Sequence, residues 1–145
     1  MKITIEEPRA GEEEQIIIKC RQIPLELLRL LNSLKSQERA LIAYIDNEIH
    51  KVIPSDIYYI ETVDNKTFLY SKSNVYESKQ KLYELEETLT GGDFMRISKS
   101  VIVNLSKIKS LVPILHSRLE AVMINNEKVI ISRHYVNELK IKFGI

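Results

Sequence analysis

The first quarter of the chain alternates short apolar runs with polar ones in a way that predicts two strands followed by a helix. Residues 2–6 and 15–20 are typical of short strands, and turn-forming and acidic residues lie between them. Leucines then recur at helical spacing, at positions 27, 28, 31 and 34, after a proline that suits the first turn of a helix. Residues 1–38 are therefore expected to form a small β-β-α appendage, whose leucines pack on the rest of the chain or on a second copy of it.

The remainder, residues 39–145, has the pattern of a mostly β (α+β) domain. Two helices are expected in it, one from an N-cap at Ser78 to about Leu89 and one from Ser132 to about Phe143. Residues 100–104 do not distinguish strand from other structure. β-Prone runs separated by turn residues predict strands at 40–45, 48–53, 57–62, 67–71, 75–77, 94–97, 108–114, 119–124 and 128–131.

The size and composition of the chain predict one main core in a soluble, cytoplasmic protein. The chain has 145 residues, of which 44% are hydrophobic, enough for one core and a short appendage. Its longest apolar runs are far shorter than the ~20 residues that a membrane-spanning helix needs. The N-terminus becomes acidic where a secretion signal would be apolar, so no export is expected.

Charge is distributed unevenly along the chain, although the net charge is only +1. Residues 96–145 contain nine Lys or Arg and three Glu, whereas residues 1–95 contain the other 12 basic residues and 17 acidic ones. This asymmetry favours a basic face that meets a polyanion. A solvated basic face without a partner is the competing interpretation.

Residue types that carry catalysis or bind metals are sparse. Cys20 is the single cysteine, which excludes an internal disulfide, a Cys-rich zinc site and a redox pair, and its apolar surroundings predict a buried core residue. The sequence has no glycine-rich phosphate loop and no hydrolase or metalloprotease motif. We therefore expect no enzyme activity, no cofactor, no metal and no small-molecule substrate.

Four blocks of sequence carry a family resemblance. In chain order they are SDIYYIE at 55–61, YES at 76–78, FMRISKSVIVN at 94–104 and ISRHYV at 131–136. Together, over about 100 residues, they resemble the LytTR family of bacterial DNA-binding domains. The resemblance implies an elongated arrangement of small, mostly antiparallel β-sheets whose loops enter successive major grooves and read short repeated sites. It thus predicts a transcription regulator whose partner is double-stranded DNA.

The resemblance also implies which residues reach DNA. Two positions depart from the usual pattern, since Ser98 stands where many members have histidine and His134 where a second arginine is common. These departures bear on which bases are read, because a hydroxyl and an imidazole make different contacts. The implied contacts are Asn65, Lys66 and Thr67 in one turn, Arg96, Ser98, Lys99 and Ser100 in one segment, and Arg133 and His134 at the start of the last helix.

The residues of these segments suit DNA on chemical grounds as well. Arg133 falls in the first helical turn, where free N–H groups favour a phosphate, although pairing with Glu138 is a structural alternative. Lys99 offers a charged donor between two hydroxyls, and a solvent-facing loop lysine is its alternative. Arg96 suits two roles equally, contact with a phosphate or bracing of the loop that follows it. Asn104 is expected to be a structural amide.

Control of such a regulator is expected to come from a partner. The roughly 38 residues before the DNA-binding part are too few for a phosphoacceptor receiver domain. Stand-alone members of this kind resemble regulators governed by a partner protein, often a membrane protein encoded nearby, and the appendage is expected to mediate homodimerisation or contact with such a regulator. The rival hypothesis is a protein-interaction module whose basic side binds an acidic partner or a membrane surface.

Overall fold

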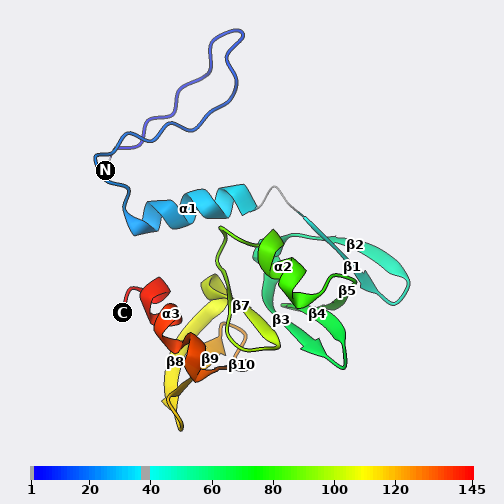
Figure 1. Cartoon of the computed structure of the whole chain (residues 1–145). Coiled ribbons are helices and arrows are strands. Elements are labelled where there is room, and N and C mark those ends of the chain that lie inside the picture. Colours follow the sequence, from blue (N-terminus) through cyan, green and yellow to red (C-terminus); the bar gives the residue numbers. More distant parts are fainter. Residues whose placement is uncertain (1, 37–39) are drawn as a thin grey trace.

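The computed structural model describes residues 2–36 and 40–145, without the side chains at positions 33, 35 and 36 (Figure 1). A seven-stranded sheet has the order β2-β1-β5-β4-β3-β7-β6, and a three-stranded sheet has the order β10-β9-β8, with every pairing antiparallel. The helices are α1 (Leu25–Ser36), α2 (Leu82–Thr88) and α3 (Arg133–Phe143). The strands are β1 (Leu41–Ile45), β2 (Glu48–Val52), β3 (Ile57–Val63), β4 (Lys66–Ser71), β5 (Val75–Ser78), β6 (Phe94–Arg96), β7 (Val101–Asn104), β8 (Ile108–Ile114), β9 (Arg118–Met123) and β10 (Lys128–Ile131).

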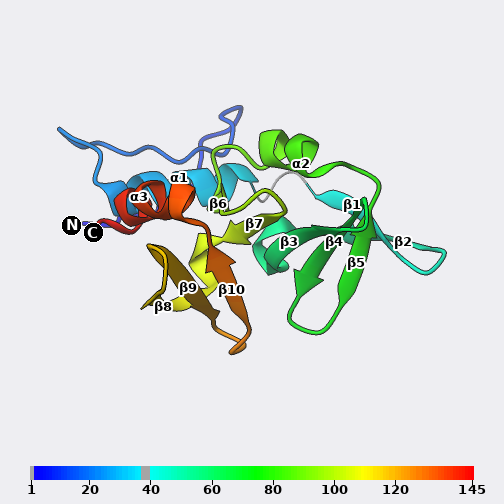
Figure 2. The ribbon, with the colours of Figure 1, turned by 60° about the horizontal axis from the view of Figure 1, so that its bottom comes forward.

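These elements confirm the mostly β fold with short helices. The ambiguous residues 100–104 contain β7, and Asp46, Asp64 and Asn65 adopt positive φ values of 53°, 51° and 62° in the two predicted hairpin turns. Asp and Asn tolerate this left-handed backbone better than most residues, which explains why the chain turns at these points. The hairpins β1 to β5 lie at one end of the molecule, and β8 to β10 with α3 lie at the other (Figure 2).

Two hydrophobic cores meet at β7. Ile102 packs in the core that α2 forms with one face of the seven-stranded sheet, where Leu85 is fully buried. Val103 faces the second core, which the three-stranded sheet and α3 close with residues such as Met123 and Leu139. Successive strand side chains point to opposite faces, so β7 joins both cores and is held from both sides.

The expected start of α2 at Ser78 is wrong. Ser78 ends β5 opposite Thr67, and its Oγ accepts a hydrogen bond from the backbone N–H of Gln80 (3.1 Å). The N-cap is instead Lys81, three residues later, and its backbone N–H donates to the Glu84 carboxylate (3.3 Å). Pairing with β4 keeps Ser78 in the sheet, so its hydroxyl stabilises a turn instead of a helix end.

The N-terminal expectations are confirmed for the helix and wrong for the strands. Helix α1 forms as predicted, but residues 2–24 contain no strand, and Cys20 is exposed instead of buried. A two-stranded hairpin without further cover is marginal in water, which accounts for the missing strands. In Figure 1 this segment projects away from the rest of the molecule. The predicted boundary at residues 38 and 39 lies outside the described residues and stays a prediction.

The leucines of α1 are only partly covered. Leu27 and Leu31 are half-buried, whereas Leu28 and Leu34 are 42% and 39% exposed.

No described helix is both long enough and apolar enough to cross a membrane.

Candidate nucleic-acid interface

Backbone hydrogen bonds bring the three predicted contact segments together. The N–H of Thr62, at the end of β3, donates to the carbonyl of Ser100 (2.9 Å). The N–H of Ser132, immediately before α3, donates to the carbonyl of Ile97 (2.9 Å). The loop between β6 and β7 is thereby held between the β3–β4 hairpin on one side and the start of α3 on the other.

The β3–β4 turn presents two of its three predicted contact residues. Asn65 and Lys66 are exposed, beside the last strand pair of the hairpin, Val63 with Lys66. Thr67 is 4% exposed, and its hydroxyl lies 3.4 Å from that of Thr62. The expected DNA contact of Thr67 does not fit this burial, because strand alternation turns Thr67 inward on the same face as the buried Leu69.

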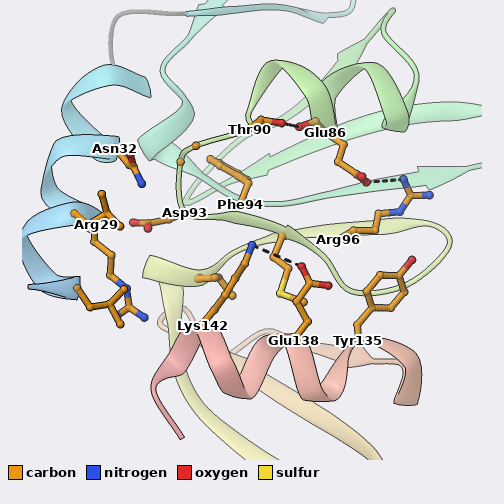
Figure 3. Close-up of a pocket in the computed structure, with 16 residues that line it drawn as sticks. Arg29, Asn32, Glu86, Thr90, Asp93, Phe94, Arg96, Tyr135, Glu138 and Lys142 are labelled. Atoms are coloured by element: carbon orange, nitrogen blue, oxygen red, sulfur yellow. Dashed lines mark hydrogen bonds and ion pairs between the residues drawn. The ribbon is translucent and has the colours of Figure 1, made fainter. Parts of the chain in front are cut away.

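Arg96 braces the β6–β7 loop. Its Nε donates to the carbonyl of Ser98 (2.7 Å), its Nη2 donates to the carbonyl of Lys99, and its Nη1 donates to the Glu86 carboxylate on α2 (3.0 Å; Figure 3). Of its two expected roles, bracing is therefore the one that the structure displays. Five donors in a rigid plane allow one guanidinium to hold two carbonyls and a carboxylate at once.

The loop that Arg96 braces exposes a lysine between two half-buried serines. The Oγ of Ser98 accepts a hydrogen bond from the backbone N–H of Ser100 (3.2 Å), which tightens the loop locally. Lys99 lies at its exposed tip. The shape of the loop is thus set by Arg96 and Ser98, and its charge is carried by Lys99.

The first turn of α3 exposes Arg133 and His134. Ser132 occupies the N-cap position, but its side chain makes no capping hydrogen bond. Among the described residues, Glu138 pairs with Lys142 one turn further along α3 (3.9 Å; Figure 3) and not with Arg133. The structural alternative for Arg133 therefore lacks its carboxylate.

Asn104 is the structural amide that its sequence context predicts. It is 2% exposed, its Nδ2 donates to the carbonyl of Ile57 (2.8 Å), and its Oδ1 accepts from the backbone N–H and the hydroxyl of Ser106 (3.1 and 2.7 Å). These bonds fix the end of β7 against the start of β3. They stabilise the two neighbouring strands that carry the contact loops.

Positioning residues were missed by sequence reasoning. Glu86 anchors Arg96 from a different element, and Thr62 anchors Ser100 through its backbone, which no side-chain pattern reveals. The sequence does indicate the burial of Thr67, because Thr67 and Leu69 are two residues apart in β4 and so lie on the same face of the strand. Alternation along that strand predicts burial of both.

A pair of stacked tyrosines lies on the neighbouring part of β3 and β4. The rings of Tyr59 and Tyr70 stack with centroids 4.3 Å apart and an angle of 13° between their planes. Burial raises the pKa of both phenols, and negative charge nearby raises it further, mainly from Glu127 for Tyr59 and from Glu61 for Tyr70. The folded state therefore favours the protonated, neutral form of both phenols.

Comparison with known proteins identifies the family and supports the fold. Residues 47–144 match the family described as the LytTr DNA-binding domain. The solved LytTr DNA-binding domain of a Bacillus cereus response regulator superposes with a TM-score of 0.69 and 28% identity, covering 73% of this chain and 97% of that domain. This match confirms both the fold class and the resemblance seen in the sequence.

Two relatives differ in how much of their length is shared. The sensory transduction protein LytT of Enterococcus faecalis is 30% identical over 100 residues, which is 69% of this chain but only 41% of that protein. An uncharacterized HTH-type transcriptional regulator of Staphylococcus aureus is 28% identical over 143 residues, covering 99% of this chain and 89% of that protein. By the match over residues 47–144, this chain belongs to the LytTr DNA-binding domain family.

Proposed function

We propose that the chain is a transcription regulator that binds specific sites in double-stranded DNA through one surface. The β3–β4 turn, the β6–β7 loop and the first turn of α3 form this surface. The observation that carries the proposal is the pair of backbone hydrogen bonds, Thr62 to Ser100 and Ser132 to Ile97, that joins these three segments within a LytTr domain.

The exposed side chains of this surface have different roles in DNA recognition. Lys99 and Arg133 reach guanine edges or phosphates, since an arginine fork matches either one through two parallel hydrogen bonds. Lys66 and Asn65, in the β3–β4 turn, contact the neighbouring sugar-phosphate backbone of the DNA. The free N–H groups at the start of α3 favour a phosphate, which the positive charges of Arg133 and Lys99 also attract.

The remaining predicted residues support these contacts. Ser98, Ser100 and His134 lie within the same segments and supply hydroxyl and imidazole groups to the groove. Arg96 acts through the loop that it braces, because its donors are already engaged by two carbonyls and Glu86. A membrane-protein partner encoded nearby stays a prediction from the family resemblance.

Selection of bound sequences from random duplexes tests the proposal. A regulator of this kind should enrich a short repeated motif, and its affinity for that motif should fall with salt by ~0.9 log units per log unit of salt for each phosphate contact. The rival module that binds an acidic protein would bind all duplexes alike. Failure to enrich any motif at moderate salt would reject the proposal.

A further inference from the structure

The segment of residues 12–21, the arm segment, has the composition of a strand without a partner in this chain. Its central isoleucines, Ile16, Ile17 and Ile18, are 73%, 65% and 36% exposed, and the described residues give them no strand pairing. β-Branched residues favour strands, and a run of three exposed ones is unusual on a surface that stays in water. The arm segment therefore needs a second strand to pair with.

The charges of the chain disfavour one hairpin pairing between the arm segment and the preceding run, residues 2–7, namely the register that aligns Ile3 with Ile18 and Ile5 with Ile16. The hairpin register that pairs Ile3 with Ile18 would also set Lys2 opposite Lys19 and Glu7 opposite Glu14. Like charges directly opposite each other destabilise an antiparallel pair. In the structure the two runs instead line a hollow, with Lys2, Glu7, Glu14 and Lys19 around it, and Figure 1 shows them as loops.

The arm segment is complementary to itself when reversed. It begins with three acids, Glu12 to Glu14, continues through the isoleucines and ends with Lys19 and Arg21. An antiparallel copy of the same segment, centred on Ile17, therefore brings Glu13 opposite Arg21 and isoleucines opposite isoleucines. A parallel copy would oppose like charges at both ends.

We propose that two copies of this chain associate through antiparallel pairing of their arm segments. Ile17 lies at the two-fold axis, Ile16 of each copy lies opposite Ile18 of the other, and Glu13 lies opposite Arg21. This register is specified by the sequence. A shift to the neighbouring symmetric registers would place Ile17 opposite Gln15 or Lys19.

Helix α1 supplies the cover that a two-stranded pairing needs. Leu25, Leu28, Leu30 and Leu34 are 53%, 42%, 55% and 39% exposed, so the helix next to the arm segment carries unburied apolar surface of its own. Strands that pack against a helix are stable where an isolated pair is not. The association thus buries both the isoleucines and these leucines, and it holds two DNA-binding domains together. It does not rest on the proposed DNA function.

Disulfide trapping tests the register on the full chain. In a Cys20→Ser background, Ile17→Cys places two thiols at directly opposite positions, where Cα atoms lie ~4.5–5.5 Å apart and within reach of a disulfide. Mild oxidation should give a covalent dimer in high yield. Ile23→Cys in the same background is the matched control, because Ile23 is 53% exposed and lies far from its own copy in this register. Equal yields from both variants would overturn the register.

A charge swap tests the association itself by sedimentation equilibrium. Glu13→Arg should weaken the dimer roughly tenfold, since two symmetry-related ion pairs become repulsive, and adding Arg21→Glu should restore it. Thermal unfolding, measured at a concentration where every variant is monomeric, should be the same in all variants, since the arm segment lies outside both cores. A wild-type chain that stays monomeric at all concentrations, or a dimer that ignores Ile17→Asp, would overturn the proposal. Binding of one domain to a single DNA site would survive either result.

Discussion

The backbone N–H of Ser132 donates to the carbonyl oxygen of Ile97 at 2.9 Å, so the residue before Arg133 is joined to the residue that precedes the Ser98–Ser100 loop. The loop is joined on its other side to the β3–β4 hairpin by the bond from Thr62 to Ser100. Main-chain bonds do not depend on side-chain rotamers. The spacing between the β6–β7 loop and the start of α3 is therefore fixed before any ligand binds.

Removal of the two principal cations should weaken specific DNA binding. We expect Lys99→Ala and Arg133→Ala each to cost ~1–3 kcal/mol of binding free energy on the selected duplex, because each loses a charged contact to a base edge or phosphate. Both side chains are exposed, so the fold should be intact. Gel-shift titration measures the affinity, and circular dichroism checks the fold.

Lys51→Ala is the matched control for these variants. Lys51 is also exposed, but it lies on β2, at the edge of the seven-stranded sheet opposite β6 and β7. Its removal should change affinity by less than either of the other substitutions. Affinity unchanged in both Lys99→Ala and Arg133→Ala would contradict the site assignment.

Arg96 should act as a positioning residue and not as a simple charge. Arg96→Lys keeps the charge but loses the fork that holds the Ser98 and Lys99 carbonyls, so we expect weaker specific binding and a loss of about 1–2 kcal/mol in the free energy of unfolding. Glu86→Gln removes only a half-exposed ion pair and should cost about 0–1 kcal/mol. Equal stability of Arg96→Lys and the wild type in urea would argue against the brace.

Asn104 should contribute strongly to stability. Asn104→Ala leaves the Ile57 carbonyl and the Ser106 N–H without their side-chain partner, and we expect it to lower the free energy of unfolding by about 2–3 kcal/mol. Urea unfolding followed by circular dichroism measures this change. Asn137→Ala, at an exposed position on α3, should stay within about 0.5 kcal/mol of the wild type. A loss as small for Asn104→Ala would show that the amide is dispensable.

Alkaline pH should destabilise the protein through Tyr59. Because the folded state raises the pKa of this phenol above its ordinary value of 10.0, the folded state holds the proton more tightly than the unfolded state. The stabilising contribution of Tyr59 is complete when the pH lies below the ordinary pKa of 10.0, and it is lost as the pH rises through the folded pKa. Tyr59→Phe should therefore show a smaller fall in unfolding free energy between about pH 8 and about pH 11.

Tyr83→Phe serves as the control for the alkaline experiment, since Tyr83 is 60% exposed on α2. It should leave the pH dependence as in the wild type. An identical pH dependence for the Tyr59→Phe protein would remove the proposed linkage.

Local chemistry in the sequence was sufficient to predict most of the fold. Asp64 and Asn65 mark a turn because they tolerate the left-handed backbone, and the strands on either side pair as that turn requires. Helix α3 begins at Arg133, directly after Ser132, as expected. The Lys99 loop and the start of α3 were identified by resemblance, and the backbone bonds now account for their proximity.

Other features depended on contacts that a linear pattern does not contain. The Glu86 anchor for Arg96 exists only because α2 packs beside β6, and Ser78 is kept from capping α2 by its pairing with Thr67. Residues 15–20 of the arm segment were expected to form a strand. Strand propensity needs a second strand, and the sequence pattern does not say which chain provides it.

The central claim is that the three joined segments form one DNA-binding surface, and amide chemical-shift mapping tests it most directly. Uniformly ¹⁵N-labelled full-length chain is titrated with the duplex enriched by selection. The account predicts that shifts concentrate together in residues 64–66, 97–100 and 132–135. Shifts confined to another face, such as the β1–β2 hairpin, with these three segments unmoved, would contradict it.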